Sequence, residues 1–235
     1  MNVAAAILLF TLIMLTSCSA VKETSDYRLK GGLYKITEKG KQRYYASVGE
    51  TSINFQPVSR SSNGIIKVND TMPAMIFPSI QNAAKRTTIF SQKSLDLDVI
   101  SIVFKYRPSR SGFPGQLNTN FNAAGYIGHR RDLSVFSYER NPVGMYDRRI
   151  AHFAYSLGFF GGLGSTAINP FVTRDPQAPE YDGLVITKGL ASLIGIGNLT
   201  FGLAVGIDHL ADQYRRQWLY QSKLWTGFTV GLNLN

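Results

Sequence analysis

The feature that most constrains this chain is a repeated alternation of apolar residues with glycine or small polar residues. Residues 224–235 read LWTGFTVGLNLN, and residues 199–210 read LTFGLAVGIDHL. Successive side chains of a strand point to opposite faces, so each segment predicts a strand with one apolar face and one small or polar face. The apolar positions are Leu199, Phe201, Leu203, Val205, Ile207, Phe228, Val230 and Leu232.

The small residues on the second face indicate which solvent the apolar face meets. A strand of a soluble sheet usually carries Lys, Glu, Gln or Thr on its polar face, whereas these strands carry Gly, Ala, Ser, Thr and Asn. Glycine weakens a strand unless neighbouring atoms crowd it, as they do inside a narrow closed barrel. A membrane barrel turns its apolar face to lipid and its polar face inward, and closure removes the unpaired edges. We therefore expect the eight apolar positions to face lipid, and His152, Ser156, Asp208, Thr229 and Asn233 to face the lumen.

Other segments repeat the pattern. Alternation continues in residues 117–127 and 151–163, and further strands are expected at 94–107, 132–140 and 183–196. Residues 183–209 predict a hairpin that turns at Gly197-Asn198, a dipeptide suited to positive φ. Together these segments give about seven strands from residue 94 onward. With a contribution from the preceding residues, they predict an all-β fold, an antiparallel transmembrane β-barrel of about eight strands, within a range of about 8–10.

The N-terminal residues predict an export signal. Residues 3–15 are an apolar run interrupted only by Thr11, too short to span a bilayer comfortably and followed by small residues. Two cleavage sites compete: the small-x-small pattern Cys18-Ser19-Ala20, and LTSC at residues 15–18, which resembles a bacterial lipobox. Cys18 is the only cysteine, so no disulfide framework is possible, and we expect it to be lipidated.

The segment between the leader and the first regular strand is more polar and less regular. We therefore expect residues 1–18 to be the signal peptide with its lipobox. Residues 19–93 would be an extension that is periplasmic or contributes one or two strands, and residues 94–235 would be the barrel.

The charge balance favours acidic partners. The chain has 25 Lys and Arg against 15 Asp and Glu, a formal net charge of +10. Such a balance suits membrane lipid and lipopolysaccharide phosphates, or nucleic acid, which an exported protein would rarely meet. General solubility is an equally good explanation. We expect a monomer in contact with membrane lipid and no nucleic-acid partner.

The lengths of the connections suggest an orientation. If the last strand ends in the periplasm, residues 165–182 and 210–222 form outer loops and Gly197-Asn198 an inner turn, as in outer-membrane barrels. Residues 129–132, HRRD, would then form a short outer turn. Trp218, Tyr220 and Trp225 would lie near the outer rim, where they are candidates for an aromatic girdle.

Lys188 does not fit the pattern simply. If Leu184, Ile186 and Leu190 face lipid, Lys188 does too, at a cost of about 2–4 kcal/mol near the midplane. The alternatives are a register shift at Gly189, or a strand in which Val185, Thr187 and Ala191 face outward and Lys188 faces the lumen. We favour the last arrangement.

The sequence predicts no catalytic, metal or cofactor site. The three histidines, His129, His152 and His209, show no HExxH or HxxxH spacing, GxSxG does not occur, and GGLGST at residues 161–166 lacks the Walker lysine. His152 and Ser156 share a strand face, but four residues separate them by more than one hydrogen bond. Asp96 and Asp98 are expected to pair with lumen Arg and Lys.

The segments TGFTVGLNLN, LTFGLAVGIDHL and FGGLG resemble strands of small outer-membrane β-barrels, in the style of uncharacterised barrel proteins of the Bacteroidota. The resemblance covers roughly residues 94–235 and implies the outer membrane of a Gram-negative bacterium. The chain departs from it at Asn235, because many such barrels end in an aromatic residue.

Three functions remain open at this point. The first is a non-enzymatic outer-membrane barrel with a structural, adhesive or narrow-pore role. The second is a soluble periplasmic lipoprotein, a β-sandwich or lipocalin-like barrel that binds an apolar ligand. The third is a barrel enzyme that modifies lipid or lipopolysaccharide.

Overall fold

A computed structural model describes residues 29–37, 40, 42–48, 53–60, 66–68, 75–77, 87–110, 112–196 and 199–232. Cys18 and the rest of the expected leader, the expected turn at Gly197-Asn198, and Asn233 lie outside the described residues. The described strands belong to two compact units, whose ranges are residues 1–32 with 45–79 and residues 33–44 with 80–235.

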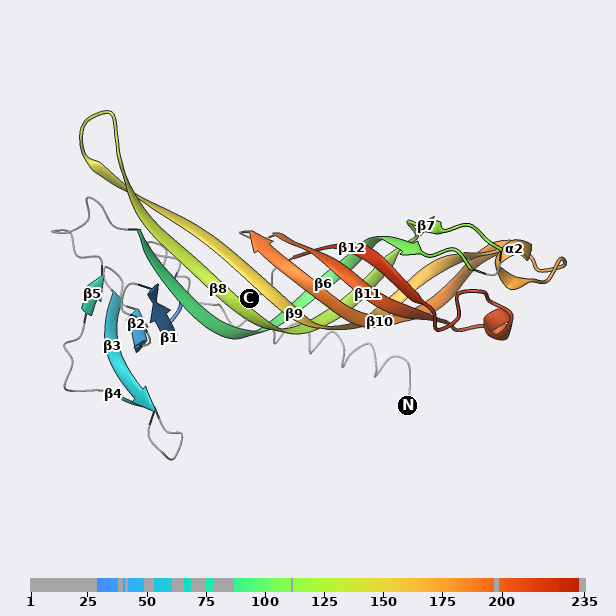
Figure 1. Cartoon of the computed structure of the whole chain (residues 1–235), viewed down its shortest axis with the longest axis horizontal. Helices are drawn as coiled ribbons and strands as arrows, with labels where there is room; N and C mark the ends of the chain where they lie inside the picture. The colour runs from blue at the N-terminus through green and yellow to red at the C-terminus, as the bar shows by residue number, and fades with distance from the viewer. Residues whose placement is uncertain are drawn as a thin grey trace, which may run out of the picture. The chain divides into compact units, whose positions relative to one another are not determined.

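Six long antiparallel strands of the larger unit close into a ring (Figure 1). They are β6 (Thr88–Arg107), β8 (Asn122–Arg140), β9 (Tyr146–Ile168), β10 (Tyr181–Ile196), β11 (Leu199–Leu210) and β12 (Leu224–Leu232). Each strand pairs with the next, and β12 pairs back with β6. The prediction of an all-β antiparallel fold is confirmed, but the ring has six strands and not about eight.

The ring has fewer strands than expected because no turn forms at HRRD, residues 129–132. The predicted turn does not exist, because β8 continues through residues 129–132, and His129 pairs with Leu95 on one side and Leu157 on the other. The segment contains no Gly, Pro or Asn, and its one common turn residue, Asp132, accepts hydrogen bonds from Ser94 and Arg130 within the sheet. Arg130 is instead held inside the sheet by Asp96 and Asp132. The strand expected at 132–140 and residues 122–127 of the strand expected at 117–127 are therefore parts of one strand.

Because β8 is continuous, the long connections all lie at one end of the ring and the short connections at the other. Residues 108–121, 169–180 and 211–223 connect strands at one end, called here the loop end. Residues 141–145 and 197–198 connect strands at the other, called the hairpin end. The loop end holds β7 (Gln116–Asn118), the helix α2 (Pro170–Thr173) and the 3-10 helix η3 (Gln213–Arg216).

β6, β8 and β9 continue past the ring at the hairpin end. There β1 (Gly32–Ile36) pairs with β6, with Tyr34 opposite Gln92 and Ile36 opposite Phe90. Phe90 packs edge-on against Phe136, with ring centroids 5.2 Å apart, and against Tyr34 at 6.4 Å. The N-terminal extension thus adds a strand to β6, beside the ring and not within it.

The smaller unit is built around β3 (Ile53–Arg60). Antiparallel pairing joins β3 to β4 (Ile66–Val68) and to β5 (Met75–Phe77). Ile53 and Phe55 of β3 are fully buried. β2 (Arg43–Val48) begins within the range of the larger unit and ends within that of the smaller.

Candidate functional site

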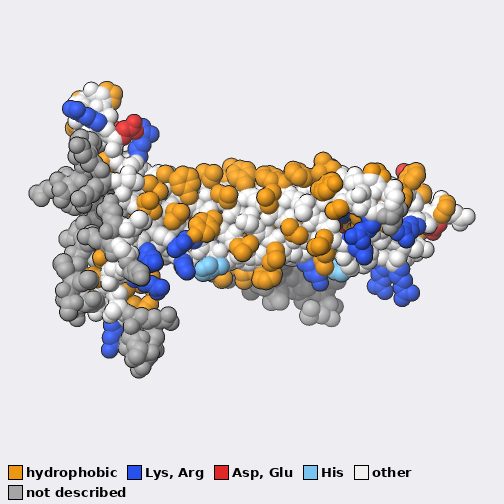
Figure 2. Space-filling view, in the orientation of Figure 1, with side chains coloured by type: hydrophobic (Ala, Val, Ile, Leu, Met, Phe, Trp, Pro, Cys, Tyr) orange, Lys and Arg blue, Asp and Glu red, His pale blue; other side chains and the backbone are white. Residues whose placement is uncertain are grey.

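The outer face of the ring is apolar all the way round. Every strand of the ring contributes large exposed hydrophobic side chains, although β8 contributes only Ile127, and Figure 2 shows such side chains spread over the visible face of the ring. We call these residues the apolar belt: Leu95, Leu97, Val99, Val103, Phe104, Ile127, Phe153, Tyr155, Leu157, Phe159, Leu163, Leu184, Ile186, Leu190, Ile194, Ile196, Leu199, Phe201, Leu203, Val205, Leu224 and Leu232.

The positions expected to face lipid all lie on this outer face. Leu199, Phe201, Leu203, Val205 and Leu232 are exposed, and Ile207, Phe228 and Val230 are half-buried on the same side of their strands. Among the positions expected to face the lumen, Ser156, Asp208 and Thr229 are buried, and His152 is half-buried on the inward side of β9.

Apolar side chains fill the middle of the ring. They form one cluster, each member at most 4% exposed: Ile100, Ile102, Ala124, Tyr126, Phe160, Ala191, Leu193, Ala204 and Trp225. The inward glycines leave room for this packing. A Cβ on Gly206 would lie 2.5 Å from Trp225 Cζ2. The crowding expected from the glycine pattern is present, and the filled interior argues against a pore at this level.

A charged cluster lies between the apolar middle and the loop end. Lys105 Nζ donates to Asp208 Oδ1 at 2.8 Å, and Arg107 Nη2 donates to Asp208 Oδ2 at 2.7 Å. Trp225 Nε1 also donates to Asp208 Oδ1, at 2.9 Å, and Arg107 Nη1 donates to Thr166 Oγ1 at 3.0 Å. All five side chains are buried, so Asp208 compensates two cations away from water.

A β-bulge explains how both cations come to face inward. β12 pairs Phe228 with Phe104 but the next residue, Thr229, with Ile102, so Val103 is an extra residue in β6. Val103 and Phe104 are both exposed, and the alternation resumes in the opposite phase. Lys105 and Arg107 would face outward without the extra residue. Our sequence reasoning missed them, although two adjacent apolar residues ahead of Lys-Tyr-Arg signal such a phase change.

A second charged cluster lies toward the hairpin end. Arg130 Nη1 donates to Asp96 Oδ1 at 3.1 Å, and Arg130 Nε donates to Asp132 Oδ1 at 2.8 Å. Asp132 also accepts a hydrogen bond from Ser94 Oγ at 3.0 Å. The expected pairing of Asp96 with a lumen arginine is confirmed. Asp98 accepts a hydrogen bond from Thr200 Oγ1 at 3.3 Å.

His152 does not contact Ser156, the residue that shares its strand face. His152 Nδ1 lies 2.8 Å from Ser134 Oγ, whereas Ser156 Oγ lies 2.7 Å from the Tyr126 hydroxyl. His152 Nε2 is 3.8 Å from Asp132 Oδ1, too long for a hydrogen bond. Because Ser134 is only 2% exposed, a substrate has no access to its hydroxyl. Within the described ranges, no three His, Cys, Asp or Glu side chains are grouped to hold a metal ion.

The three residues predicted to form an aromatic girdle do not lie on the surface of the ring. Trp218, Tyr220 and Trp225 are 3%, 2% and 1% exposed. Trp225 lies on the inward face of β12, where Asp208 binds its indole N–H. The Arg107 guanidinium lies 5.2 Å from the Trp218 ring centre and 5.1 Å from that of Tyr220. Burial raises the pKa of the Tyr220 hydroxyl, which therefore stays neutral beside the cation. Asp208 and Arg107 thus contact all three aromatic side chains, which are buried and do not lie on the surface.

The preferred orientation of Lys188 is also wrong. Val185, Thr187 and Ala191 are buried, whereas Lys188 is exposed among Leu184, Ile186 and Leu190. No register shift occurs at Gly189, which faces inward, where a Cβ would lie 2.6 Å from Gly206 Cα. The interior therefore has no space for a lysine at this level.

No protein-family model matches this chain, and neither a curated protein nor a solved structure matches it. No helix within the described ranges is long and apolar enough to cross a membrane.

Proposed function

We propose that this chain is a non-enzymatic integral protein of the outer membrane, a sealed barrel of six strands with a structural or adhesive role. One observation carries the proposal: the apolar belt surrounds a ring whose interior holds buried charges. A soluble barrel has a polar outer face, whereas membrane barrels have an apolar outer face and hold polar and charged side chains inside. This ring holds such charges on both sides of its apolar middle.

The energetic argument concerns the belt. Soluble monomers rarely expose contiguous apolar patches larger than a few hundred Å², whereas every strand of this ring carries large apolar side chains at its surface. Burying one such side chain away from water is worth about 1.5–3 kcal/mol. Lipid removes the whole belt from water without a protein partner. A monomer in a bilayer therefore accounts for the belt more simply than a soluble monomer does.

Strand lengths are compatible with this environment. A membrane strand needs about 9–11 residues when it is tilted. β10, β11 and β12 have 16, 12 and 9 residues. A ring of six strands is narrower than the barrels of about eight or more strands that are typical of outer membranes, and the filled interior fits that narrowness.

The interior argues against two of the other roles. A lipocalin-like binding protein needs an apolar cavity, but the described side chains fill this ring with an apolar middle between two charged clusters. A pore would need a continuous lumen. A structural or adhesive role through the loop end is what remains.

The loop end suits an acidic partner. The exposed residues Arg174, Arg215, Arg216 and Lys223 lie in its connections, together with Phe171, which is 68% exposed. In the proposed orientation these connections face outward and could contact lipopolysaccharide phosphates.

Membrane fractionation tests the proposal. The full chain, expressed in a Gram-negative host, should remain in the membrane pellet after washing with carbonate and with salt, and should require detergent for extraction. Unheated samples should migrate differently from boiled ones in electrophoresis, because a closed barrel resists unfolding by detergent. A folded chain that stays in solution without detergent would instead support the soluble periplasmic lipoprotein.

A further inference from the structure

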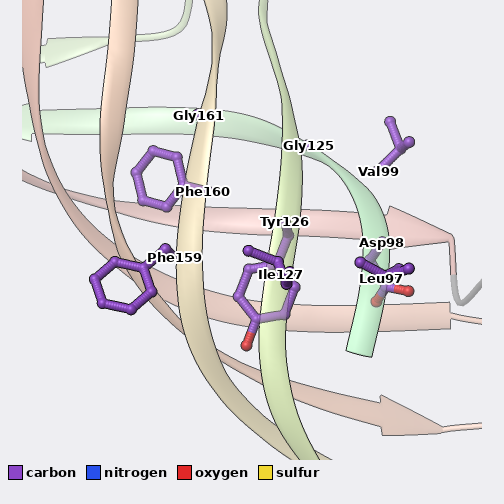
Figure 3. Close-up of a pocket in the computed structure, with 9 residues that line it drawn as sticks. All are labelled: Leu97, Asp98, Val99, Gly125, Tyr126, Ile127, Phe159, Phe160 and Gly161. Atoms are coloured by element: carbon purple, nitrogen blue, oxygen red, sulfur yellow. The ribbon is translucent and has the colours of Figure 1, made fainter. Parts of the chain in front are cut away.

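A groove of about 500 Å³ crosses the apolar belt on β6, β8 and β9 (Figure 3). The exposed side chains of Leu97, Val99, Ile127 and Phe159 line it, and Gly125 and Gly161 form its floor. The two glycines pair directly across β8 and β9. The belt is therefore interrupted where two adjacent strands both lack an outward side chain.

Crowding does not explain these two glycines. A Cβ on Gly161 would meet no atom within 4 Å, and one on Gly125 would meet only Gly161 O, at 4.0 Å. Inward glycines such as Gly206 are different, because a Cβ there would collide with Trp225. Gly125 and Gly161 thus keep open a space at the surface that larger side chains could fill.

Lys188 continues the row formed by the two glycines. It pairs directly with Gly161 from the neighbouring strand β10, and its side chain is exposed. No described residue forms a hydrogen bond or ion pair with its ammonium group. In hydrocarbon near the midplane such a charged side chain is unfavourable. The cost falls when the long side chain brings its charge to the membrane interface and an anion there.

The pairing register shows how this row lies in the ring. The row begins at Leu224, the first residue of β12, and passes through Ile207, Lys188, Gly161, Gly125 and Val99 before it returns to β12 at Leu232. It therefore descends from the loop end to the hairpin end in one circuit. Lys188 lies nearer the loop end than both glycines. A lipid anchored at Lys188 would extend down the groove, in the direction of an acyl chain.

We propose that this groove binds an anionic lipid of the outer leaflet, the leaflet that the loop end faces. Lys188 contacts the phosphate, and one acyl chain lies over Gly161 and Gly125 between the apolar walls. The inference rests on the proposed membrane location. The positive charge of Lys188 favours an anionic headgroup, and the apolar groove beside it favours an acyl chain. A second copy of this protein is the competing occupant of a groove with a glycine floor.

Native mass spectrometry of the full chain, released from detergent micelles doped with phosphatidylglycerol or phosphatidylcholine, tests the site. We expect the wild type to retain phosphatidylglycerol about fivefold more than phosphatidylcholine, the preference that the attraction of one lysine to an anionic lipid near a membrane surface supplies. Lys188→Gln should remove this preference while some uptake of both lipids persists. Gly161→Leu fills the groove and should lose uptake of both.

Matched variants control for charge and bulk. Lys93→Gln removes another exposed lysine, on β6, and Ser192→Leu places the same leucine side chain at an exposed position of β10 outside the groove. Both should behave like the wild type. An unchanged headgroup preference in Lys188→Gln would overturn the site, as would identical uptake by Gly161→Leu and Ser192→Leu. A dimer that Gly161→Leu dissociates would assign the groove to a second copy.

The same samples separate this inference from the proposed function. Each variant is first checked for its need for detergent and for the electrophoretic shift on heating. A wild type that needs detergent but shows no preference for phosphatidylglycerol overturns the lipid site alone. A wild type that stays folded without detergent overturns both.

Discussion

Lys105 Nζ lies 2.8 Å from Asp208 Oδ1, although the two residues belong to β6 and β11, which do not pair with each other. β12 lies between their strands and contributes Trp225, whose indole N–H binds the same carboxylate oxygen. Arg107 completes the cluster from β6, at 2.7 Å from Asp208 Oδ2. The contact thus crosses the interior at the seam where β12 closes the ring onto β6.

Removing the charge of Asp208 should destabilise the ring strongly. Asp208→Asn leaves the buried Lys105 and Arg107 without their counter-ion, which typically costs about 3–5 kcal/mol. Glu180→Gln, an exposed change in a loop-end connection, is the control and should be close to neutral. Unfolding by denaturant in detergent measures both variants. Equal midpoints for Asp208→Asn and Glu180→Gln would show that the cluster does not hold the seam together.

Adding bulk at an inward glycine should be costly, whereas adding it at an outward glycine should not. Gly206→Val places a Cβ 2.5 Å from Trp225 Cζ2, and overpacking of this kind costs about 1–3 kcal/mol. Gly161→Val is the matched control, because a Cβ there meets no atom within 4 Å. The free energy of unfolding should fall only for Gly206→Val. A similar loss in both variants would mean that interior crowding is not the cause.

Protease added to intact cells should cut only at the loop end. Arg174, Arg215 and Arg216 are exposed there, whereas the exposed Arg140 and Arg149 flank the connection at the hairpin end. If the loop end faces outward, trypsin cleaves at the first group in intact cells and at the second only after permeabilisation. Fragment masses distinguish the two ends. Cleavage at Arg149 in intact cells would reverse the proposed orientation.

Cys18 should carry the lipid anchor. The chain has no other cysteine, and LTSC at residues 15–18 resembles a lipobox. Mass spectrometry of the protein from cells should find a mature N-terminus at an acylated Cys18. A mature chain that begins after Ala20, or a free thiol at position 18, would show that the leader is an ordinary secretory signal.

The sequence predicted the strand architecture well where the alternation is regular. β10, β11 and β12 lie close to their expected bounds, and Leu203 and Asp208 lie on the expected faces. In these strands the face to which a side chain points, and the face to which its pairing partners point, both follow the same period of two. This makes the faces readable from a single segment.

The errors occurred where contacts distant in sequence decide the structure. Arg130 holds β8 straight through an expected turn by binding Asp96, 34 residues away. The bulge at Val103 depends on pairing with β12 and brings Lys105 and Arg107 inside. Trp225 is inward because Asp208 and Gly206 provide a partner and a space for its indole. None of these contacts follows from local periodicity, although the adjacent apolar residues Val103 and Phe104 do mark the change of phase.

The measurement that tests the central claim most directly is the accessibility of a nitroxide on the apolar belt. Leu203 is 70% exposed in the belt, and Val143, 81% exposed at the hairpin connection, is the matched control outside the ring. Single cysteines at these positions, in a Cys18→Ser background reconstituted in liposomes, carry the label. At position 203 we expect oxygen, which partitions into lipid, to relax the label more than a water-soluble nickel chelate does, with the reverse order at position 143. Equal access of the nickel chelate to both positions would contradict a lipid-facing belt.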